Sequence, residues 1–255
     1  MSDPQPQQVF DAHLHIVNPA HPLIENNGFM PDPFTVADYQ DRISDLHICG
    51  GAVVSGSFQA FDQGYLVDAL RALGSSFVGV TQIPADITDQ EVLDLHEAGV
   101  RAVRFNVARG GSAALSDLDR MARRVYDLAG WHTELYIDAR TIDEELSRTI
   151  ASLPAVSIDH LGMHAEGLSN LLRLVERGVK VKATGFGRVN LDPTAVMRAI
   201  VDVDPSALMV GTDLPSTRAQ RPFENSDFDT IRETLEPAQI AAVFWDNAAD
   251  FYLGV

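Results

Sequence analysis

Two histidines lie two residues apart near the start of the chain, within the apolar segment 9–16 (VFDAHLHI). In an extended strand, side chains at positions i and i+2 point to the same side, so His13 and His15 are expected to aim two imidazoles into one space. Such a pair can serve proton transfer or metal binding. An amphipathic strand with two half-buried histidines has the same spacing, so the interpretation depends on which groups meet the pair.

Polar side chains recur near the carboxyl ends of the later apolar segments. They are Ser57 and Gln59, Arg104 and Asn106, Tyr136 and Asp138, Asp159 and His160, Lys182 and Arg188, and finally Asp213. A buried charge costs several kcal/mol unless it is paired, so charged groups in such places are usually held by a function or by a partner. Any one of them fits a structural salt bridge, but their recurrence at one end of successive segments indicates a site.

Eight apolar segments with strand character alternate with helical patterns along the chain. The segments cover residues 9–16, 50–57, 77–83, 100–106, 133–139, 156–161, 179–185 and 207–213. Their spacing is close to that of βα units, and most are continuously apolar, as in parallel strands covered on both faces. This pattern predicts a single α/β domain, a (β/α)8 TIM-like barrel, with its active site at the carboxyl ends of the strands. A doubly wound open sheet is the alternative, but no Gly-x-Gly-x-x-Gly motif follows an early strand.

Local signals predict where several helices begin. Thr88 and the pair Asp192-Pro193 are typical of the first residues of a helix. Thr141, followed three residues later by Glu144, predicts a capping box for the helix after the fifth strand.

Composition limits the class of protein. Of the 255 residues, 45% are hydrophobic, which is enough for a full globular core. Lys and Arg total 19 against 36 Asp and Glu, and the net charge of −17 argues against nucleic acid or an anionic membrane as a partner. The single cysteine, Cys49, excludes an internal disulfide framework. We expect residues 1–8 to form a flexible tail ahead of a barrel over residues 9–255.

Targeting signals are absent from the sequence as given. The first residues lack the basic region and apolar core of a signal peptide, and no apolar run reaches the ~18 residues of a membrane span. A soluble cytoplasmic protein is therefore expected. The oligomeric state is left open.

Six motifs in a fixed order carry a resemblance to a known family. They are residues 10–15 (FDAHLH), 99–106 (GVRAVRFN), 157–162 (SIDHLG), 181–188 (VKATGFGR), 210–215 (VGTDLP) and 246–252 (DNAADFY). From about residue 9 to its end, the chain resembles the amidohydrolase superfamily, and within it the lactonases similar to 2-pyrone-4,6-dicarboxylate lactonase.

The resemblance implies catalytic roles for five of the polar side chains. Asp213 corresponds to the general base that takes a proton from the attacking water, and His13 and His15 face it across the barrel mouth. His160 and Tyr136 correspond to donors for the carbonyl oxygen or the leaving group. Ester hydrolysis needs such a base and a preorganised positive site for the oxyanion.

The resemblance also implies a substrate-binding set that consists mainly of arginines. It comprises Arg104 and Arg188 at strand ends, Arg109 in a loop of looser alignment, and the neighbouring Asn106 and Gln59. Arginine forks suit carboxylates, so the expected partner is a small acidic substrate.

Metal dependence is a separate question. Members of the superfamily that use a metal bind it with the two histidines of the first strand, histidines or a carboxylated lysine on later strands, and the final aspartate. Tyr136 stands where these members carry a histidine, which favours the lactonases that work without a divalent ion, so no cofactor is expected. His13, His15 and Asp213 nevertheless remain three possible ligands for zinc or another divalent metal.

Other titratable side chains are interpreted as structural or surface groups. They are His47, His96 and His132 beside predicted helices, Glu134 in the fifth strand, and Arg218 and Arg221 in the loop after Asp213. The two loop arginines are interpreted as solvated charges, and closure over an acidic substrate is the alternative.

The sequence thus predicts a hydrolase that opens a lactone or similar cyclic ester bearing a carboxylate, in the catabolism of aromatic or sugar acids. One alternative is a metal-dependent amidohydrolase or decarboxylase that uses His13, His15 and Asp213. A second alternative is a barrel that binds an acidic ligand without catalysis.

Overall fold

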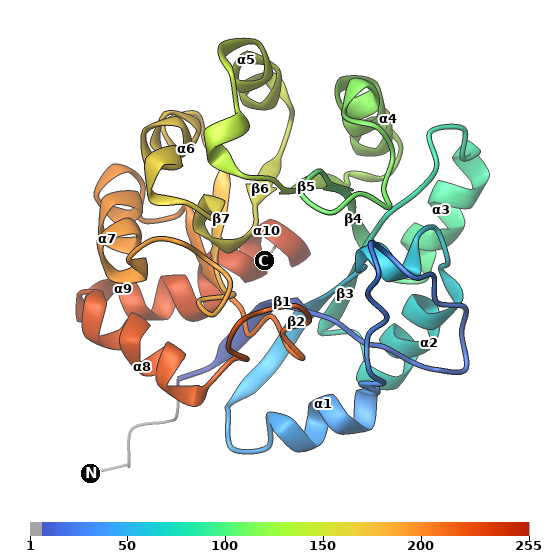
Figure 1. The fold of residues 1–255 in the computed structure, drawn as a ribbon, viewed down its shortest axis with the longest axis horizontal. Helices are drawn as coiled ribbons and strands as arrows, with labels where there is room; N and C mark the ends of the chain where they lie inside the picture. Colours follow the sequence, from blue (N-terminus) through green and yellow to red (C-terminus); the bar gives the residue numbers. More distant parts are fainter. Residues whose placement is uncertain (1–6, 255) are drawn as a thin grey trace.

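The computed structural model describes residues 7–254 and shows one barrel of parallel strands surrounded by helices (Figure 1). Of the predicted tail, residues 1–6 lie outside the described residues, and the first strand begins at Val9. No helix within residues 7–254 has the length and apolar character needed to cross a bilayer.

Eight strands pair in parallel and in chain order, from β1 to β8. They are β1 (Val9–Leu14), β2 (Ile48–Val54), β3 (Phe77–Thr81), β4 (Val100–Asn106), β5 (His132–Tyr136), β6 (Val156–Ile158), β7 (Lys180–Ala183) and β8 (Leu208–Val210). The predicted (β/α)8 barrel is confirmed, since an open doubly wound sheet would reverse its strand order. Several strands end earlier than predicted, because the chain turns at the polar residues that follow them, as at the short 3-10 turn His160–Gly162.

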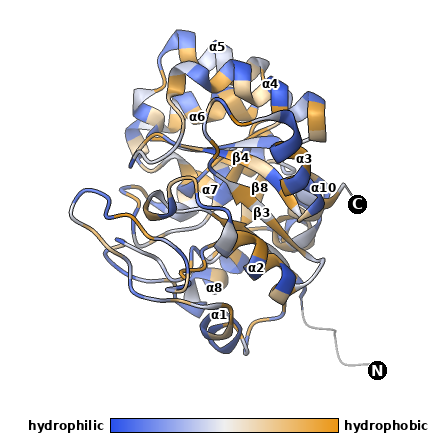
Figure 2. Cartoon of the chain, turned by 90° about the vertical axis from the view of Figure 1, so that its right-hand side faces the viewer, coloured by the Kyte–Doolittle hydropathy of each residue, from blue (hydrophilic) through white to orange (hydrophobic). Residues whose placement is uncertain are grey.

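Helices follow the strands and cover the outside of the barrel. They are α1 (Val36–Arg42), α2 (Gly64–Leu73), α3 (Asp89–Glu97), α4 (Leu118–Ala129), α5 (Glu144–Ser152), α6 (Leu168–Val175), α7 (Pro193–Val203), α8 (Asn225–Thr234), α9 (Pro237–Ala241) and α10 (Asn247–Leu253). Strand residues on the outer side pack against these helices in one large core cluster. Figure 2 shows the same division, with apolar colour toward the strands and hydrophilic colour on the outer sides of helices.

Two predictions about local structure were wrong. The N-cap of α5 is Asp143, whose carboxylate accepts a hydrogen bond from the Leu146 amide at 2.8 Å. Thr141 instead ends a 3-10 turn, because the buried Ile142 separates it from the helix. His132 is neither a surface nor a capping residue: it starts β5 and is buried, since that strand begins one residue before the predicted segment.

Helix α10 closes the amino-terminal end of the barrel, where Figure 1 shows it behind the strands. The Tyr252 ring stacks on Phe10 with centroids 5.3 Å apart. The Tyr252 hydroxyl donates to the Glu134 carboxylate and, at 3.3 Å, to the Ala12 carbonyl oxygen. An inner core cluster joins α10 to the strands, and it comprises Phe10, Ala12, Ala52, Val54, Val78, Val80, Ala102, Met209, Ala248 and Tyr252.

An irregularity in β1 turns both histidines toward the inside. The register of β1 against β2 shifts between Asp11 and Leu14. Ala12 belongs to the inner cluster and Leu14 to the outer one, yet His13 also faces inward, toward Asp213. Strict alternation would have sent Ala12 and His13 to opposite sides. The shift acts as a β-bulge does, by re-aiming a side chain beside a functional site.

The seam between the last and the first strand depends on one buried carboxylate. Asp11 accepts hydrogen bonds from the Thr212 amide (2.8 Å), the Thr212 hydroxyl (2.7 Å) and the Tyr39 hydroxyl (2.9 Å). Burial raises the pKa of Asp11 to about 6, although these hydrogen bonds oppose the rise. Backbone bonds continue the seam, since the Asp213 amide donates to the His13 carbonyl oxygen at 2.7 Å. The aspartate of the first motif therefore joins the ends of the barrel.

We expect Asp11→Ala to lower the free energy of unfolding by about 3–5 kcal/mol, because it leaves the Thr212 amide and two hydroxyls buried without an acceptor. Tyr39→Phe removes a single donor and should cost about 1–2 kcal/mol. Urea unfolding measures both variants. Equal losses in the two would contradict the role of Asp11 at the seam.

Candidate active site

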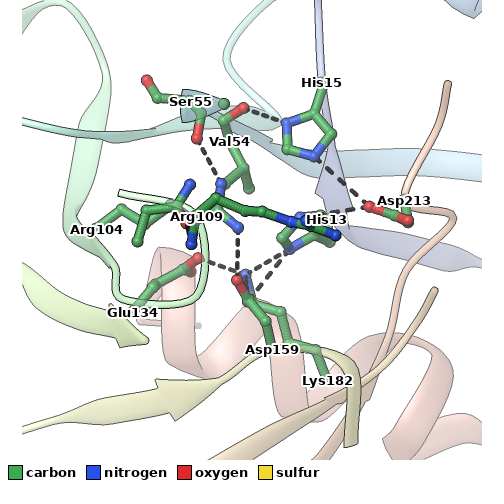
Figure 3. Close-up of polar contacts among 12 residues, drawn as sticks. His13, His15, Val54, Ser55, Arg104, Arg109, Glu134, Asp159, Lys182 and Asp213 are labelled. Atoms are coloured by element: carbon green, nitrogen blue, oxygen red, sulfur yellow. Dashed lines mark hydrogen bonds and ion pairs between the residues drawn. The ribbon is translucent and has the colours of Figure 1, made fainter. Parts of the chain in front are cut away.

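The carboxyl ends of the strands bring His13, His15 and Asp213 together (Figure 3). Asp213 Oδ1 lies 3.7 Å from His13 Nε2 and 3.6 Å from His15 Nε2, and all three side chains are buried. His15 Nδ1 donates to the Val54 carbonyl oxygen at 2.6 Å, which holds the ring with Nε2 toward Asp213. The side chains of His13 and His15 thus converge on one carboxylate.

Asp213 is held by a strained backbone and by Arg188. Its φ is 58°, in the left-handed region that costs a non-glycine residue about 1–2 kcal/mol. Arg188 Nε donates to Asp213 Oδ2 at 2.7 Å, and Nη2 donates to the same oxygen. Burial tends to raise the pKa of Asp213, but the charge of Arg188 lowers it far below its usual range. Oδ1 has no hydrogen-bond partner among residues 7–254, so one buried carboxylate oxygen is left unpaired beside the two histidines.

Beneath the mouth, Asp159 links His13 to two cations. Its carboxylate lies 2.7 Å from Arg104 Nη2, 3.4 Å from Lys182 Nζ and 3.3 Å from His13 Nδ1. Lys182 Nζ also donates to the Glu134 carboxylate at 2.5 Å. Burial tends to raise the pKa of Asp159, but His13, Lys182 and Arg104 lower it well below its usual range. An ionised network therefore supports His13 from below.

His160 and Tyr136 line the same cavity as His15. Their rings meet edge to face with centroids 5.0 Å apart, and the His160 ring lies 4.9 Å from that of His13. Within the described part of the chain, neither His160 Nδ1 nor the Tyr136 hydroxyl has a hydrogen-bond partner, although both are buried. Burial lowers the pKa of His160 well below its usual value, so the ring is neutral near pH 7. Both groups are free to contact a substrate oxygen.

A cavity of about 30 Å³ lies at the mouth, which is room for about two water molecules. Four of its lining residues are arginines, namely Arg104, Arg109, Arg188 and Arg218, and none of its lining residues is acidic. In Figure 3 the Arg109 side chain extends across the mouth. A protein with a net charge of −17 thus presents a locally cationic cavity.

The predicted substrate-binding residues divide into three kinds. Asn106 and Arg109 line the cavity, with the Arg109 amide bound to Asn106 Oδ1 at 3.1 Å. Arg104 and Arg188 also line it, but both are ion-paired with buried carboxylates. Gln59 does not line the cavity. Its Nε2 donates to the Ile16 carbonyl oxygen at 2.8 Å and its Oε1 accepts from the Gly56 amide at 2.7 Å, so its amide shapes the loop instead.

Sequence reasoning missed two features of the mouth. Arg218, interpreted as a solvated charge, lines the cavity and lies over the Phe29 ring. Arg221 does not line the cavity and forms an ion pair with Asp227, which is closer to its interpretation as a surface charge. Asp159 had been noted at a strand end but had no role. Its partner His13 lies 146 residues earlier in the chain, so no local pattern in the sequence could identify this contact.

The donor set also fits a divalent ion. Ligand atoms of His13, His15 and Asp213 lie within 4.8 Å of one another, and three such ligands suit a catalytic zinc. If neutral His15 donates through Nδ1, its Nε2 lone pair faces a carboxylate oxygen, and only a cation or an added proton makes that contact favourable. Arg188 opposes an ion at this place, because it already neutralises Asp213.

Comparisons with known proteins agree with the motifs. The family model of the amidohydrolases matches residues 10–253. The chain is 30% identical over 161 residues to 2-pyrone-4,6-dicarboxylate hydrolase of Comamonas testosteroni, in a match that covers 62% of this chain and 52% of that relative. The match thus spans about half the length of this relative. A 4-sulfomuconolactone hydrolase of Rhizobium radiobacter is 25% identical over 229 residues, or 82% of this chain and 76% of the relative.

A solved structure shares the fold over nearly the whole chain. It is the crystal structure of a probable 2-pyrone-4,6-dicarboxylic acid hydrolase from Acinetobacter baumannii with citric acid bound. Its TM-score is 0.84 at 19% identity, and the alignment covers 96% of this chain and 98% of the other.

The different surroundings of the arginines predict different effects of mutation. Arg104→Met should lower the free energy of unfolding by about 3–5 kcal/mol, because it leaves the buried Asp159 with one cation fewer. Arg109→Met should leave the urea midpoint unchanged, because that side chain is exposed and has no carboxylate partner within residues 7–254. An unchanged midpoint for Arg104→Met would mean that its pairing with Asp159 does not stabilise the barrel.

Proposed function

The chain belongs to the amidohydrolase family, and on that premise we propose that it is a hydrolase that opens a lactone, or a similar cyclic ester, bearing an anionic group. The observation that carries the proposal is the unpaired Oδ1 of Asp213, which lies 3.7 Å from His13 Nε2 and 3.6 Å from His15 Nε2. His15 lines the cavity, so this oxygen beside its Nε2 is placed to take a proton from water bound there.

The proposed reaction uses the buried groups in order. Asp213 accepts a proton from a water molecule as the water oxygen bonds to the ring carbonyl carbon. Charge develops on the carbonyl oxygen, where Tyr136 and neutral His160 are placed to donate. The ring C–O bond then breaks, the leaving oxygen takes up the proton, and the product is a ring-opened acid. His13 and His15 orient the water through their Nε2 atoms.

The charge of the cavity supports an anionic substrate. Long-range repulsion from a net charge of −17 disfavours any anion, so binding requires a local excess of cations. Four arginines line the cavity, and two of them, Arg109 and Arg218, have no carboxylate partner within the described residues. The names of the relatives agree, since one hydrolyses a dicarboxylate and another a sulfonated lactone. Catabolism of aromatic acids is the corresponding setting.

A second candidate is a metal-dependent amidohydrolase, favoured by the convergence of His13, His15 and Asp213. These residues would hold the ion, which would supply a Lewis acid and an activated water. The ion pair between Arg188 and Asp213, and Tyr136 in place of a histidine, favour the reaction without metal.

We expect Asp213→Asn to lower kcat by about 10²–10⁴-fold, because an amide cannot accept the proton from water. The loss is measured as the rate of hydrolysis of a panel of carboxylated lactones, monitored through the protons released. Circular dichroism and the urea midpoint check that the fold is retained. Turnover close to that of the wild type would remove Asp213 from the role of base.

The pH profile tests the same assignment through the lowered pKa of Asp213. A base with a depressed pKa stays ionised until the pH falls below that depressed value, so kcat/KM should hold from pH 8 down to about pH 5. In Arg188→Met, the guanidinium no longer offsets the effect of burial on the pKa of Asp213. The pKa of Asp213 then rises and the acid limb of kcat/KM should move to higher pH. If the acid limb of kcat/KM does not move in this variant, a group other than Asp213 causes it.

Chelation separates the two candidates. The metal-free reaction predicts that protein dialysed against EDTA keeps its lactonase activity and contains less than about one-tenth equivalent of metal. Lost activity that zinc or manganese restores would replace the first candidate with the second.

A further inference from the structure

The two histidines of the site differ in what faces the ring nitrogen that points away from Asp213 (Figure 3). His15 Nδ1 lies 2.6 Å from the Val54 carbonyl oxygen, and a carbonyl oxygen can only accept, so Nδ1 carries the proton and Nε2 has a lone pair. His13 Nδ1 lies 3.4 Å from Lys182 Nζ, and an ammonium group can only donate. The Lys182 contact therefore requires a lone pair on His13 Nδ1 and places the proton of that ring on Nε2.

A carboxylate competes with Lys182 for His13 Nδ1. Asp159 Oδ1 lies 3.3 Å from this nitrogen and would favour a proton there, but it accepts no hydrogen bond from any residue in the range 7–254. At the other end of the ring, His13 Nε2 lies 3.7 Å from the anionic oxygen Asp213 Oδ1, which favours a proton on Nε2 and disfavours a lone pair. The ring is fully buried beside the Lys182 cation, which favours its neutral form with one proton. Two of the three facing groups thus agree on Nε2.

Opposite tautomers would fix the orientation of one water molecule among the three side chains. Ligand atoms of His13, His15 and Asp213 lie within 4.8 Å of one another, so a single water about 2.8 Å from each can bridge them. Such a water donates to Asp213 Oδ1 and to the lone pair of His15 Nε2, accepts from His13 Nε2, and keeps one lone pair for the ester carbon. With lone pairs on both Nε2 atoms, three acceptors would compete for two protons and no donor would direct the water oxygen.

We propose that Lys182 holds the proton of His13 on Nε2, opposite to the tautomer of His15, so that the two histidines fix the attacking water in one orientation. The proposal rests on the proposed function for the role of the water, and on the contacts of the two rings for the tautomers. Lys182 does not line the cavity, so it is a positioning residue that acts through His13. Ion pairs with two buried carboxylates, at 2.5 and 3.4 Å, hold its ammonium group in place.

The wild-type protein tests the tautomers directly. Long-range proton–nitrogen NMR correlation spectra of the histidine rings distinguish a ring nitrogen that carries hydrogen from one with a lone pair. They are recorded at pH 7 on isotope-labelled protein as purified, and His13→Asn and His15→Asn identify the two sets of signals. His13 should carry its proton on Nε2 and His15 on Nδ1. The same tautomer in both rings, two protons on His13, or a bound ion that occupies both Nε2 atoms would overturn the proposal.

A charge-balanced variant tests the part of Lys182. Lys182→Met alone would leave Glu134 buried without its cation, so it is combined with Glu134→Gln. The His13 proton should then move to Nδ1, where Asp159 is the remaining partner. Because the water is then misdirected, kcat for the best lactone of the panel should fall about ten- to a hundredfold, while KM changes less than about twofold.

Tyr252→Phe is the matched control, because it removes a hydrogen bond to Glu134 and leaves Lys182 and the buried charges in place. It should keep the His13 tautomer and the kcat of the wild type. Thermal midpoints check that both variants are folded, and if the double variant does not fold, the wild-type spectra still decide.

Two results for the double variant would contradict the proposal. A His13 proton that stays on Nε2 would remove Lys182 from its part, and a proton that moves without loss of kcat would remove the link to the water. If no lactone is hydrolysed, the proposed function fails, whereas the tautomers are still read from the spectra.

Discussion

Charge balance inside the barrel is the constraint on which the mouth depends. Three of the fully buried carboxylates, Glu134, Asp159 and Asp213, are ion-paired, and without a partner each buried charge would cost several kcal/mol. Lys182, Arg104 and Arg188 supply the matching positive charges. These three cations are therefore committed to the fold, and selection among substrates falls to cations on loops.

The difference between paired cations inside the barrel and unpaired cations on loops explains which features could be predicted from the sequence. The strand segments, the barrel and the convergence of His13, His15 and Asp213 follow from periodicity and from the rule that parallel strands end on one side. Which arginine pairs with which carboxylate does not follow, because it depends on neighbours around the barrel that are far apart in the chain. Arg104 illustrates this point, since its partner Asp159 lies 55 residues away.

Other features had only weak signals in the sequence. The register shift in β1 is set by how that strand meets β2 and the seam, so alternation alone misplaces Ala12 or His13. The Asn27-Gly28 turn is a recognisable signal, but its docking against Arg218 depends on two loops with no periodicity. Gln59 was expected to bind the substrate because it is a polar residue near a strand end. Its side chain instead forms hydrogen bonds with the backbone of Ile16 and Gly56.

The seam at Asp11 also has a consequence for how the chain acquires its fold. The first strand pairs with β2 on one side, but its other edge is completed by Thr212 and Leu214, about 200 residues later. Contacts of such long sequence separation form late, since the intervening loop entropy must be paid first. During synthesis the edge of β1 is therefore open until the chain past β8 has emerged. The same edge carries the two histidines, so the mouth is completed in one of the last steps of folding.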